Sequence, residues 1–524
     1  MQRRTFLAGL AALAATGPAA AQMKMDGMKH DMPGMGGHAG HDMGTSTSAT
    51  PVLPEGQPLR DLMRLANEST VPGSFKAKLA AEPAVARYAE GIDTPILGYN
   101  GTSPGPLIEV NEGDRVEIEF ANNIPDEIST IHWHGMPVPA DQDGNPMDPV
   151  ASGSDRTYVF DLPEGSAASY WYHPHPHGKT AQQVYRGLAG AFLVKPKVDP
   201  IPAEYGDTIV MFTDLRLAAD GIMPASTMAD MMNGRVGDHV LVNGQKNPSL
   251  ALKRGEKRRL RLYNATNARF LRLTFENASM VVVGTDGGLL EKPVPVDEIL
   301  LTPAERVELV VTFEKPGAVI LRTLDYDRGW MGSDKPKDAG IALLTANVSE
   351  TPADPVPPLP EKLRSIKPLG TAAVTRRFVF TESMEMDAGG MSMRSHDMQM
   401  GSDSMAMISD QMKMQFLING VVFDMNRVDV VSKVGDVELW EVVNQSDMDH
   451  PFHVHGTQFQ VVEHELSGKV TKPTYLSWKD TVNVMQGETV RLLLRQDMSG
   501  RRMYHCHILE HEDLGMMGIV DVQA

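Results

Sequence analysis

One pattern of turn residues occurs three times along the 524-residue chain and restricts its fold more than any other feature. Each copy has an Asn-Gly pair, then a Gly followed by an acidic residue, then an alternating segment that ends at a second Asn. The copies begin at Asn100, Asn243 and Asn419, and in all three the second Asn lies nine residues after the later Gly. Because the same residue types recur at the same spacing, we predict three homologous domains.

The segments between these turns have the texture of β-strands. Val116, Ile118 and Phe120 share one face of such a segment, and the glutamates between them lie on the other face. Short alternating runs bounded by Gly, Pro and Asn are typical of antiparallel β-sandwiches, so we predict an all-β chain. Helical periodicity is scarce, and residues 59–67 (LRDLMRLAN) are the best candidate for a short helix.

Composition indicates where the domains begin and end. The Pro-rich segments 196–203 and 352–360 are typical of linkers. Residues 22–50 hold six Met and three His among Gly, Asp and Ser, and we interpret them as a disordered tail. A second stretch with ten Met, residues 384–414, resembles that tail, and we interpret it as a Met-rich surface insert. The predicted β-sandwich domains are residues 51–197, 198–360 and 361–524, with the insert in the third.

Residues 1–21 have the pattern of an export signal. Arg3 and Arg4 precede an apolar run, and the alanines at 19–21 offer a cleavage site. The arginine pair followed by Thr-Phe-Leu resembles twin-arginine signals, so we expect a periplasmic protein. No other run of 18 apolar residues occurs, which predicts a mature protein without a membrane span. The formal charge of −18, or −20 without the signal, disfavours nucleic acid as a partner. We expect a monomer.

Ten of the 17 histidines fall into four clusters, and each cluster contains a His-x-His pair. Residues i and i+2 of a strand point to the same face, about 6–7 Å apart, so each pair can reach neighbouring metal ions. Eight imidazoles are too many for one ion, and they suffice for a site of three ions. The pairs are His132 and His134, His173 and His175, His453 and His455, and His505 and His507.

The last pair encloses the only cysteine of the chain, Cys506. In this His-Cys-His strand the thiol points away from the two imidazoles and can bind a separate metal. His450 and His511 complete a His₂Cys set with Met516 as the axial thioether, which is the ligand set of a blue-copper electron-transfer site. Zinc is the alternative metal, but it needs neither the bridge nor an axial Met. The pattern predicts an electron-entry copper joined through Cys506 to a three-copper cluster that reduces dioxygen to water.

The motifs HWHG, WYHPHPHGKT, HPFHVHGTQF and HCHILEHEDLGMMG resemble, in this order, those of the multicopper oxidase family. The resemblance spans residues 85–524. It implies three cupredoxin-like domains of Greek-key topology and four copper ions: one type 1, one type 2 and two type 3. It assigns to the type 1 copper His450, Cys506, His511 and Met516; to the type 2 copper His132 and His453; and to the two type 3 coppers the sets His134, His173 and His507, and His175, His455 and His505.

The resemblance also indicates two acidic residues that deliver protons during the reduction of dioxygen. Asp143 lies in the loop expected near the type 2 copper, and Glu512 directly follows the type 1 ligand His511. Four protons must reach a buried site, so nearby carboxylates suit this task. The alternative for both residues is a structural role as hydrogen-bond acceptors.

Within the family, the chain most resembles the periplasmic cuprous oxidases of bacterial copper tolerance. The resemblance rests on the export signal, the Met-rich insert and the motif endings GKT and HEDLGMM. Thioethers prefer Cu(I), so a Met-rich surface can gather this ion near the type 1 site. The candidate ligands of the substrate Cu(I) are Met448 and Asp447, which lie just before His450, and Met384, Met386, Met391 and Met393 of the insert.

We therefore predict an enzyme that oxidises Cu(I) to Cu(II) with dioxygen as the electron acceptor. The alternative is a laccase-type oxidase of phenols or other organic molecules, which differs in its natural substrate only. A second alternative is a copper-sequestering protein without turnover, which the two Met-rich segments alone would support. A copper nitrite reductase is disfavoured, because it has no use for a thiolate bridge to a three-copper cluster.

Overall fold

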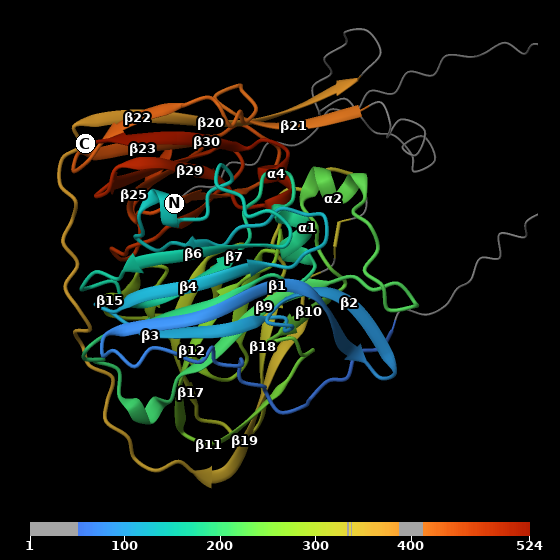
Figure 1. Cartoon of the computed structure of the whole chain (residues 1–524). Helices are drawn as coiled ribbons and strands as arrows, with labels where there is room; N and C mark the ends of the chain where they lie inside the picture. Colours follow the sequence, from blue (N-terminus) through green and yellow to red (C-terminus); the bar gives the residue numbers. More distant parts are fainter. Residues whose placement is uncertain (1–50, 333–334, 337, 387–411) are drawn as a thin grey trace, which may run out of the picture. The chain divides into compact units, whose positions relative to one another are not determined.

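The structure is a computed structural model, and it describes residues 51–332, 335–336, 338–386 and 412–524 (Figure 1). The predicted signal, the predicted tail and residues 387–411 of the predicted insert lie outside the described residues. The rest forms three β-sandwiches of two sheets each, which confirms the all-β prediction. No described helix has the length and apolar character that a membrane crossing requires.

The first sandwich contains η1 (Ala140–Gln142), α1 (Thr180–Tyr185) and the strands β1 (Ser74–Ala89), β2 (Ile92–Tyr99), β3 (Gly105–Asn111), β4 (Arg115–Asn122), β5 (His132–His134), β6 (Ser154–Asp161), β7 (Ala168–His173) and β8 (Gly190–Lys195). Its sheets have the orders β2-β1-β4-β6 and β3-β8-β7-β5. Along β4, buried residues alternate with half-exposed ones, as the sequence predicts. The buried side chains of both sheets form one continuous apolar core.

The second sandwich contains η2 (Ala203–Tyr205), α2 (Met228–Asn233) and the strands β9 (Thr208–Leu215), β10 (His239–Val242), β11 (Ser249–Arg254), β12 (Glu256–Asn264), β13 (Leu271–Phe275), β14 (Ser279–Thr285), β15 (Gly288–Val296), β16 (Ile299–Leu301), β17 (Arg306–Phe313), β18 (Gly317–Leu324) and β19 (Ala342–Pro352). Its sheets have the orders β10-β9-β12-β17-β14-β15 and β11-β19-β18-β13-β16. They enclose a second apolar core.

The third sandwich contains α4 (Leu509–Asp513) and the strands β20 (Val374–Met386), β21 (Met412–Ile418), β22 (Val430–Lys433), β23 (Val437–Asn444), β24 (His450–Val454), β25 (Phe459–Leu466), β26 (Lys469–Thr471), β27 (Thr481–Val484), β28 (Glu488–Arg495), β29 (Gly500–Cys506) and β30 (Met517–Gln523). Its sheets have the orders β21-β20-β23-β28-β25-β26 and β22-β30-β29-β24-β27. The strands β24 and β29, which carry His450, His453 and His505, are neighbours in the second of these sheets.

The repeated turn pattern has the same structure in each domain. Asn100, Asn243 and Asn419 have φ of 50°, 50° and 55°, and the glycines that follow them also have positive φ, as a type I′ hairpin turn requires. The side-chain oxygen of each Asn accepts a backbone hydrogen bond from β1, β9 or β20. The second Asn of each copy donates to two backbone carbonyls further along its own domain. The repeat therefore marks one hairpin and one loop anchor in every sandwich.

Residues 59–67 are extended, so the prediction of a short helix there is wrong. Arg64 forms an isolated β-bridge with Leu107 at the edge of the first sandwich. The backbone N–H of Leu65 donates to the carbonyl of Leu107, and the N–H of Leu107 donates to the carbonyl of Met63. Leu65 also packs against the core of the first sandwich. The apolar spacing that suggested a helix serves instead to hold an extended segment against a neighbouring sheet.

Replacing Asn264 by Ala should lower stability without touching the histidine clusters. The change removes the amide that donates to the buried carbonyls of Arg269 and Leu301, and only the Arg269 carbonyl keeps a second side-chain donor, the hydroxyl of Thr266. Each unsatisfied buried group costs about 1–3 kcal/mol, so we expect a lower midpoint of thermal unfolding in differential scanning calorimetry. The exposed Asn123 replaced by Ala is the control, and equal midpoints for the two variants would contradict the anchoring role.

Candidate metal centre

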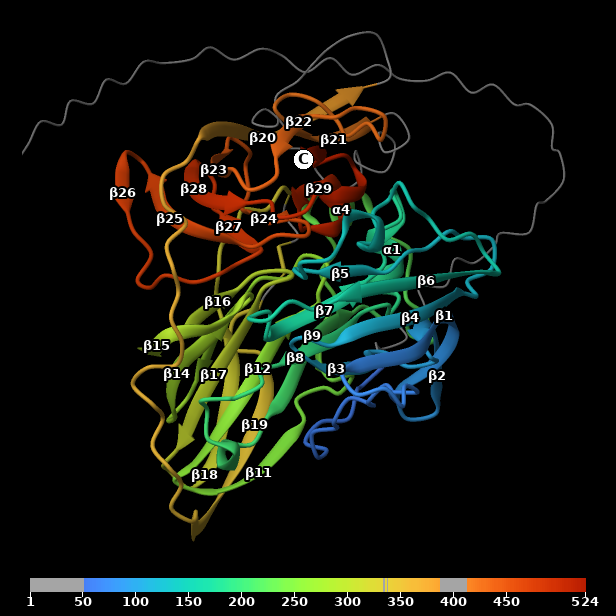
Figure 2. The same ribbon diagram turned by 60° about the vertical axis from the view of Figure 1, so that its left-hand side comes forward.

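The four His-x-His pairs lie where the first and third domains meet. In the first domain, β5 pairs with β7 so that His132 lies opposite His173. In the third domain, β24 pairs with β29 so that His453 lies opposite His505. Figure 2 shows α4, which follows β29, beside α1 of the first domain, and these two helices are in contact. Each pair lies at or just beyond the end of a strand, and two paired strand ends from each domain bring the eight imidazoles together.

The imidazoles of the two domains stack on one another across this junction. The ring centroids of His132 and His455 are 3.7 Å apart, and those of His134 and His453 are 3.8 Å apart. The ring of His507 meets that of His134 edge-on at 4.9 Å. All eight rings are fully buried. The side chains that the sequence singled out therefore form one cluster.

Among the described residues, five groups of three side chains place their donor atoms within 4.8 Å of one another. The groups are His132, His453 and His455; His132, His134 and His173; His175, His455 and His505; His134, His453 and Asp480; and His450, Cys506 and His511. The third group coincides with one predicted type 3 set, and the last coincides with the predicted type 1 set without its Met. His507 is in none of these groups, although its ring contacts those of His134 and His173.

Several of these rings have one nitrogen without a hydrogen-bond partner among the described residues. Nδ1 of His132 lies 3.1 Å from the carbonyl oxygen of Asp143, and Nδ1 of His173 lies 2.9 Å from that of Pro174. Nε2 of both rings is buried and has no hydrogen-bond partner. Burial lowers the pKa of His173 well below its usual value, and the neighbouring His132 lowers it further, so this ring is neutral. Histidines that bind metals are held by the opposite nitrogen in this way.

Other imidazole nitrogens of the cluster face each other. Nε2 of His505 lies 3.1 Å from Nε2 of His455 and 3.3 Å from Nε2 of His175. Nδ1 of His505 donates to the carbonyl of Cys506, and Nδ1 of His455 donates to the carboxylate of Asp143, which leaves lone pairs on both Nε2 atoms. Lone pairs at this distance repel one another unless a cation lies between them. The residues present therefore fit a bound metal, and imidazole suits copper.

A separate donor group lies at the end of β29. Nδ1 of His450 is 3.3 Å from Sγ of Cys506 and 3.3 Å from Nδ1 of His511. The opposite nitrogens are held by Oγ of Ser446 at 2.7 Å and by the carbonyl of Met232 at 3.2 Å. Burial raises the pKa of the Cys506 thiol, so its thiolate form requires a bound cation. This donor set also fits copper.

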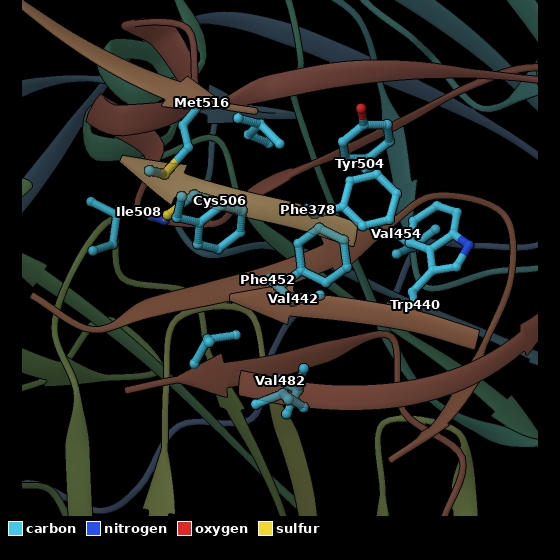
Figure 3. Close-up of a cluster of buried hydrophobic side chains, with 14 of the residues drawn as sticks. Phe378, Trp440, Val442, Phe452, Val454, Val482, Tyr504, Cys506, Ile508 and Met516 are labelled. Carbon is cyan, nitrogen blue, oxygen red and sulfur yellow. The ribbon is translucent and has the colours of Figure 1, made fainter. Parts of the chain in front are cut away.

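The predicted axial ligand Met516 lies in the same apolar cluster as Cys506 (Figure 3). Both side chains are fully buried. The backbone N–H of Cys506 donates to the carbonyl of Met516 at 3.0 Å, which holds the two segments side by side. Phe416 stacks on the ring of His511 with centroids 3.7 Å apart. Apolar side chains thus keep water away from the donor group.

Both predicted acids lie against the imidazoles. Oδ2 of Asp143 is 3.0 Å from Nδ1 of His455, and Oε2 of Glu512 is 3.1 Å from Nδ1 of His505. Oε1 of Glu512 is 3.5 Å from Nε2 of His175. Burial raises the pKa of Glu512, but His175 and His505 outweigh this effect and bring the pKa down to about 2. Glu512 is therefore ionised at neutral pH.

Sequence reasoning missed a third carboxylate, Asp480. Its Oδ1 lies 3.0 Å from Nε2 of His134, and its carbonyl lies 2.7 Å from Nδ1 of His453. Both carboxylate oxygens accept hydrogen bonds from Arg306, at 2.8 and 2.5 Å. A Cβ atom at Gly135 would lie 2.0 Å from Oδ2, which explains the glycine after the first histidine pair. Asp480 carries no local motif, and no signal in the sequence pointed to it.

The predicted Cu(I) ligands beside His450 differ in their surroundings. Met448 is fully buried, and its Sδ accepts a hydrogen bond from Nη1 of Arg328 at 3.7 Å. Asp447 is half-buried, and its backbone N–H donates to the carboxylate of Glu382 at 3.1 Å. Asp447 belongs to none of the groups of His, Cys, Asp and Glu donors among the described residues.

The ends of the Met-rich insert are strands, so the prediction of a surface segment over all of 384–414 is wrong at its ends. In the β20–β21 ladder, Met384 lies opposite Met414, and Met386 also belongs to this ladder. Met alternates with polar residues there, which is the period of a strand. Met384 is half-buried against the core of the third domain. The candidates Met391 and Met393 lie outside the described residues.

Comparisons with known proteins decide the family. Residues 81–199, 210–327 and 397–524 each match the family described as multicopper oxidase. The chain belongs to the multicopper oxidase family. The family uses copper and dioxygen, and the protein is an oxidoreductase.

Individual relatives agree with this membership. Multicopper oxidase mco of Staphylococcus aureus is 33% identical over 452 residues, which cover 85% of this chain and 88% of that protein. The solved multicopper oxidase from Campylobacter jejuni, described as a metallo-oxidase, is 40% identical with a TM-score of 0.82, and the match covers 91% of this chain and 98% of that one. The laccase of Bacillus subtilis is 27% identical over 82% of this chain and 90% of that protein.

Replacing Asp480 by Asn should weaken copper binding by the eight-imidazole cluster. The change removes the charge that orients His134, and losses of such partners reduce metal affinity about 10–100-fold. We expect less copper per protein after dialysis against a chelator, with the blue absorption of the Cys506 site retained.

The control is Asp207→Asn, which removes a carboxylate partner of Arg261 in the second domain. Copper content equal to that of the wild type in Asp480→Asn would contradict the proposed role of this carboxylate.

Proposed function

We propose that this protein is a periplasmic cuprous oxidase that protects against copper. It oxidises four Cu(I) ions and reduces one dioxygen with four protons, which gives four Cu(II) ions and two waters. Export by the twin-arginine route would deliver the folded protein to the compartment where Cu(I) is toxic and dioxygen is present.

In this proposal the protein holds four resident copper ions. The type 1 ion takes His450, Cys506, His511 and Met516; the type 2 ion takes His132 and His453; the type 3 ions take the sets His134, His173 and His507, and His175, His455 and His505. When bound, these ions accept and pass on single electrons, which couples a one-electron donor to the four-electron reduction of dioxygen. Cys506 joins the two parts of the site, because its neighbours on both sides belong to the imidazole cluster.

Methionines near the Cys506 donor group are the reason for proposing Cu(I) as the substrate. Met414 and Met232 belong to the same buried cluster as Cys506, and Met384 and Met331 pack against its edge. Thioethers are soft ligands that prefer Cu(I) over Cu(II). The description of the Campylobacter jejuni relative as a metallo-oxidase supports the same substrate class.

The acids hold the histidines and handle protons. The Asp143 carboxylate orients the ring of His455, and the ionised Glu512 lies between His175 and His505. Because Glu512 is ionised at neutral pH, its carboxylate is able to accept a proton and release it again. Glu512 thus serves as a relay for the protons that the reaction consumes.

A laccase-type oxidase of phenols is the second candidate, and the likeness to the Bacillus subtilis laccase favours it. The two functions share the same copper ligands and differ only at the surface where the electron donor docks. The third possibility, a sequestering protein without turnover, does not explain a complete oxidase site or membership of an oxidase family.

Two changes to residues 387–411 separate the candidates. In the first, the six Met of this segment are replaced by Leu, which keeps its length and bulk. We expect the kcat/KM for Cu(I) in an oxygen-uptake assay to fall about tenfold or more, because Leu has no sulfur lone pair, while phenol oxidation stays unchanged. In the second, the segment is replaced by a short Gly-Ser linker, and the ratio of phenol oxidation to Cu(I) oxidation should then rise because all six thioethers are lost.

Equal losses of both activities in the Met→Leu variant would contradict a Cu(I)-specific role. An unchanged rate with Cu(I) would favour the laccase function.

A further inference from the structure

The guanidinium of Arg328 is buried near the Cys506 donor group and forms no ion pair with a carboxylate of the described residues, although the carboxylates of Asp338, Asp449 and Glu510 act on its charge from further away. The residue is 6% exposed, and none of the ion pairs among the described residues includes it. Buried charged side chains are almost always paired with an opposite charge. Its pKa is lowered by burial to about 10, so the side chain remains a cation at neutral pH. Burying a charge without an ion-pair partner lowers the stability of the folded protein, so a functional reason for Arg328 is expected.

The position of Arg328 is fixed by contacts that also involve the histidine ligands. Nη1 donates to Sδ of Met448 at 3.7 Å, and Nη2 donates to the carbonyl of Asn233. The neighbouring carbonyl, that of Met232, accepts the hydrogen bond of His511. One end of helix α2 therefore holds both the cation and a predicted copper ligand.

Aromatic rings and the backbone complete this enclosure. The guanidinium carbon lies 5.4 Å from the ring centroid of Phe270 and 5.3 Å from that of Trp330. The backbone N–H of Asp449 donates to the carbonyl of Arg328 at 2.7 Å, directly before His450. Cation–π contacts stabilise the charge without neutralising it. The positive charge therefore persists close to the donor group.

We propose that Arg328 is a positioning residue whose fixed positive charge raises the reduction potential of the copper held by His450, Cys506 and His511. Cu(II) carries one more positive charge than Cu(I), so a neighbouring cation disfavours the oxidised form more than the reduced form. Within a buried site this interaction is only weakly screened. The proposal rests on the assignment of this donor group to the type 1 copper, and it holds for either electron donor.

The test is a redox titration of the blue absorption in copper-loaded variants. Arg328→Gln and Arg328→Met both remove the charge. The Met variant is included because its side chain can be buried without a hydrogen-bond partner, so it is less prone to misfold than the Gln variant. Arg328→Lys keeps the charge but loses the guanidinium geometry. Arg235→Gln is the matched control, because Arg235 is also buried near α2 and contacts the ring of Tyr185.

We expect the neutral variants to shift the equilibrium toward Cu(II) about tenfold or more, which equals a fall of about 59 mV per tenfold for one electron. Arg328→Lys and Arg235→Gln should remain close to the wild type. The difference between wild type and Arg328→Gln should persist at high ionic strength, because salt does not reach the charge.

Unchanged potentials in Arg328→Gln and Arg328→Met would overturn the proposal. Equal shifts in the Lys and Gln variants would also overturn it, because they would trace the effect to packing rather than charge. The variant Cys506→Ser tests separately whether this donor group holds the type 1 copper. If the blue absorption remained in that variant, the assignment of the donor group would be wrong.

Discussion

Buried imidazoles that lack hydrogen-bond donors at their inner nitrogens are the constraint on which the site depends. Such atoms lose water on folding and gain no partner among the residues that the structure describes, which is costly. His132, His173 and His453 each carry an Nε2 atom of this kind where two domains meet. Bound copper would supply the missing partner, so copper binding stabilises the junction as well as enabling the chemistry. The sandwiches thus provide rigid strand ends, and the metal joins them.

A buried ion pair fixes the geometry of that junction in all three domains. Arg306 begins β17 in the second domain, its Nε donates to the carbonyl of Ser169 in the first, and both terminal nitrogens bind Asp480 of the third. Asp480 in turn contacts His134. Removing one member of a buried pair costs about 3–5 kcal/mol. The second domain carries none of the predicted copper ligands, but through Arg306 it determines how the other two face each other.

Local patterns predicted what depends on local structure. The hairpins at the Asn-Gly turns and the His-x-His strand ends were readable because their spacing follows the period of a strand. Asp480, Arg306 and Arg328 were not readable, because each belongs to a segment without a motif and acquires its role only when the domains dock. Residues 59–67 were misinterpreted because their conformation also depends on distant parts of the chain. Their apolar side chains pack against a neighbouring sheet and do not form one face of a helix.

The most direct test of the central claim is the stoichiometry of dioxygen to Cu(I) in the copper-loaded protein. An oxygen electrode with simultaneous optical measurement of Cu(I) gives the ratio during steady turnover. The proposed function predicts one dioxygen consumed for every four Cu(I) oxidised, without hydrogen peroxide, and loss of this activity in Cys506→Ser. A ratio of one dioxygen to two Cu(I) with peroxide release, or equal rates in the two proteins, would contradict it.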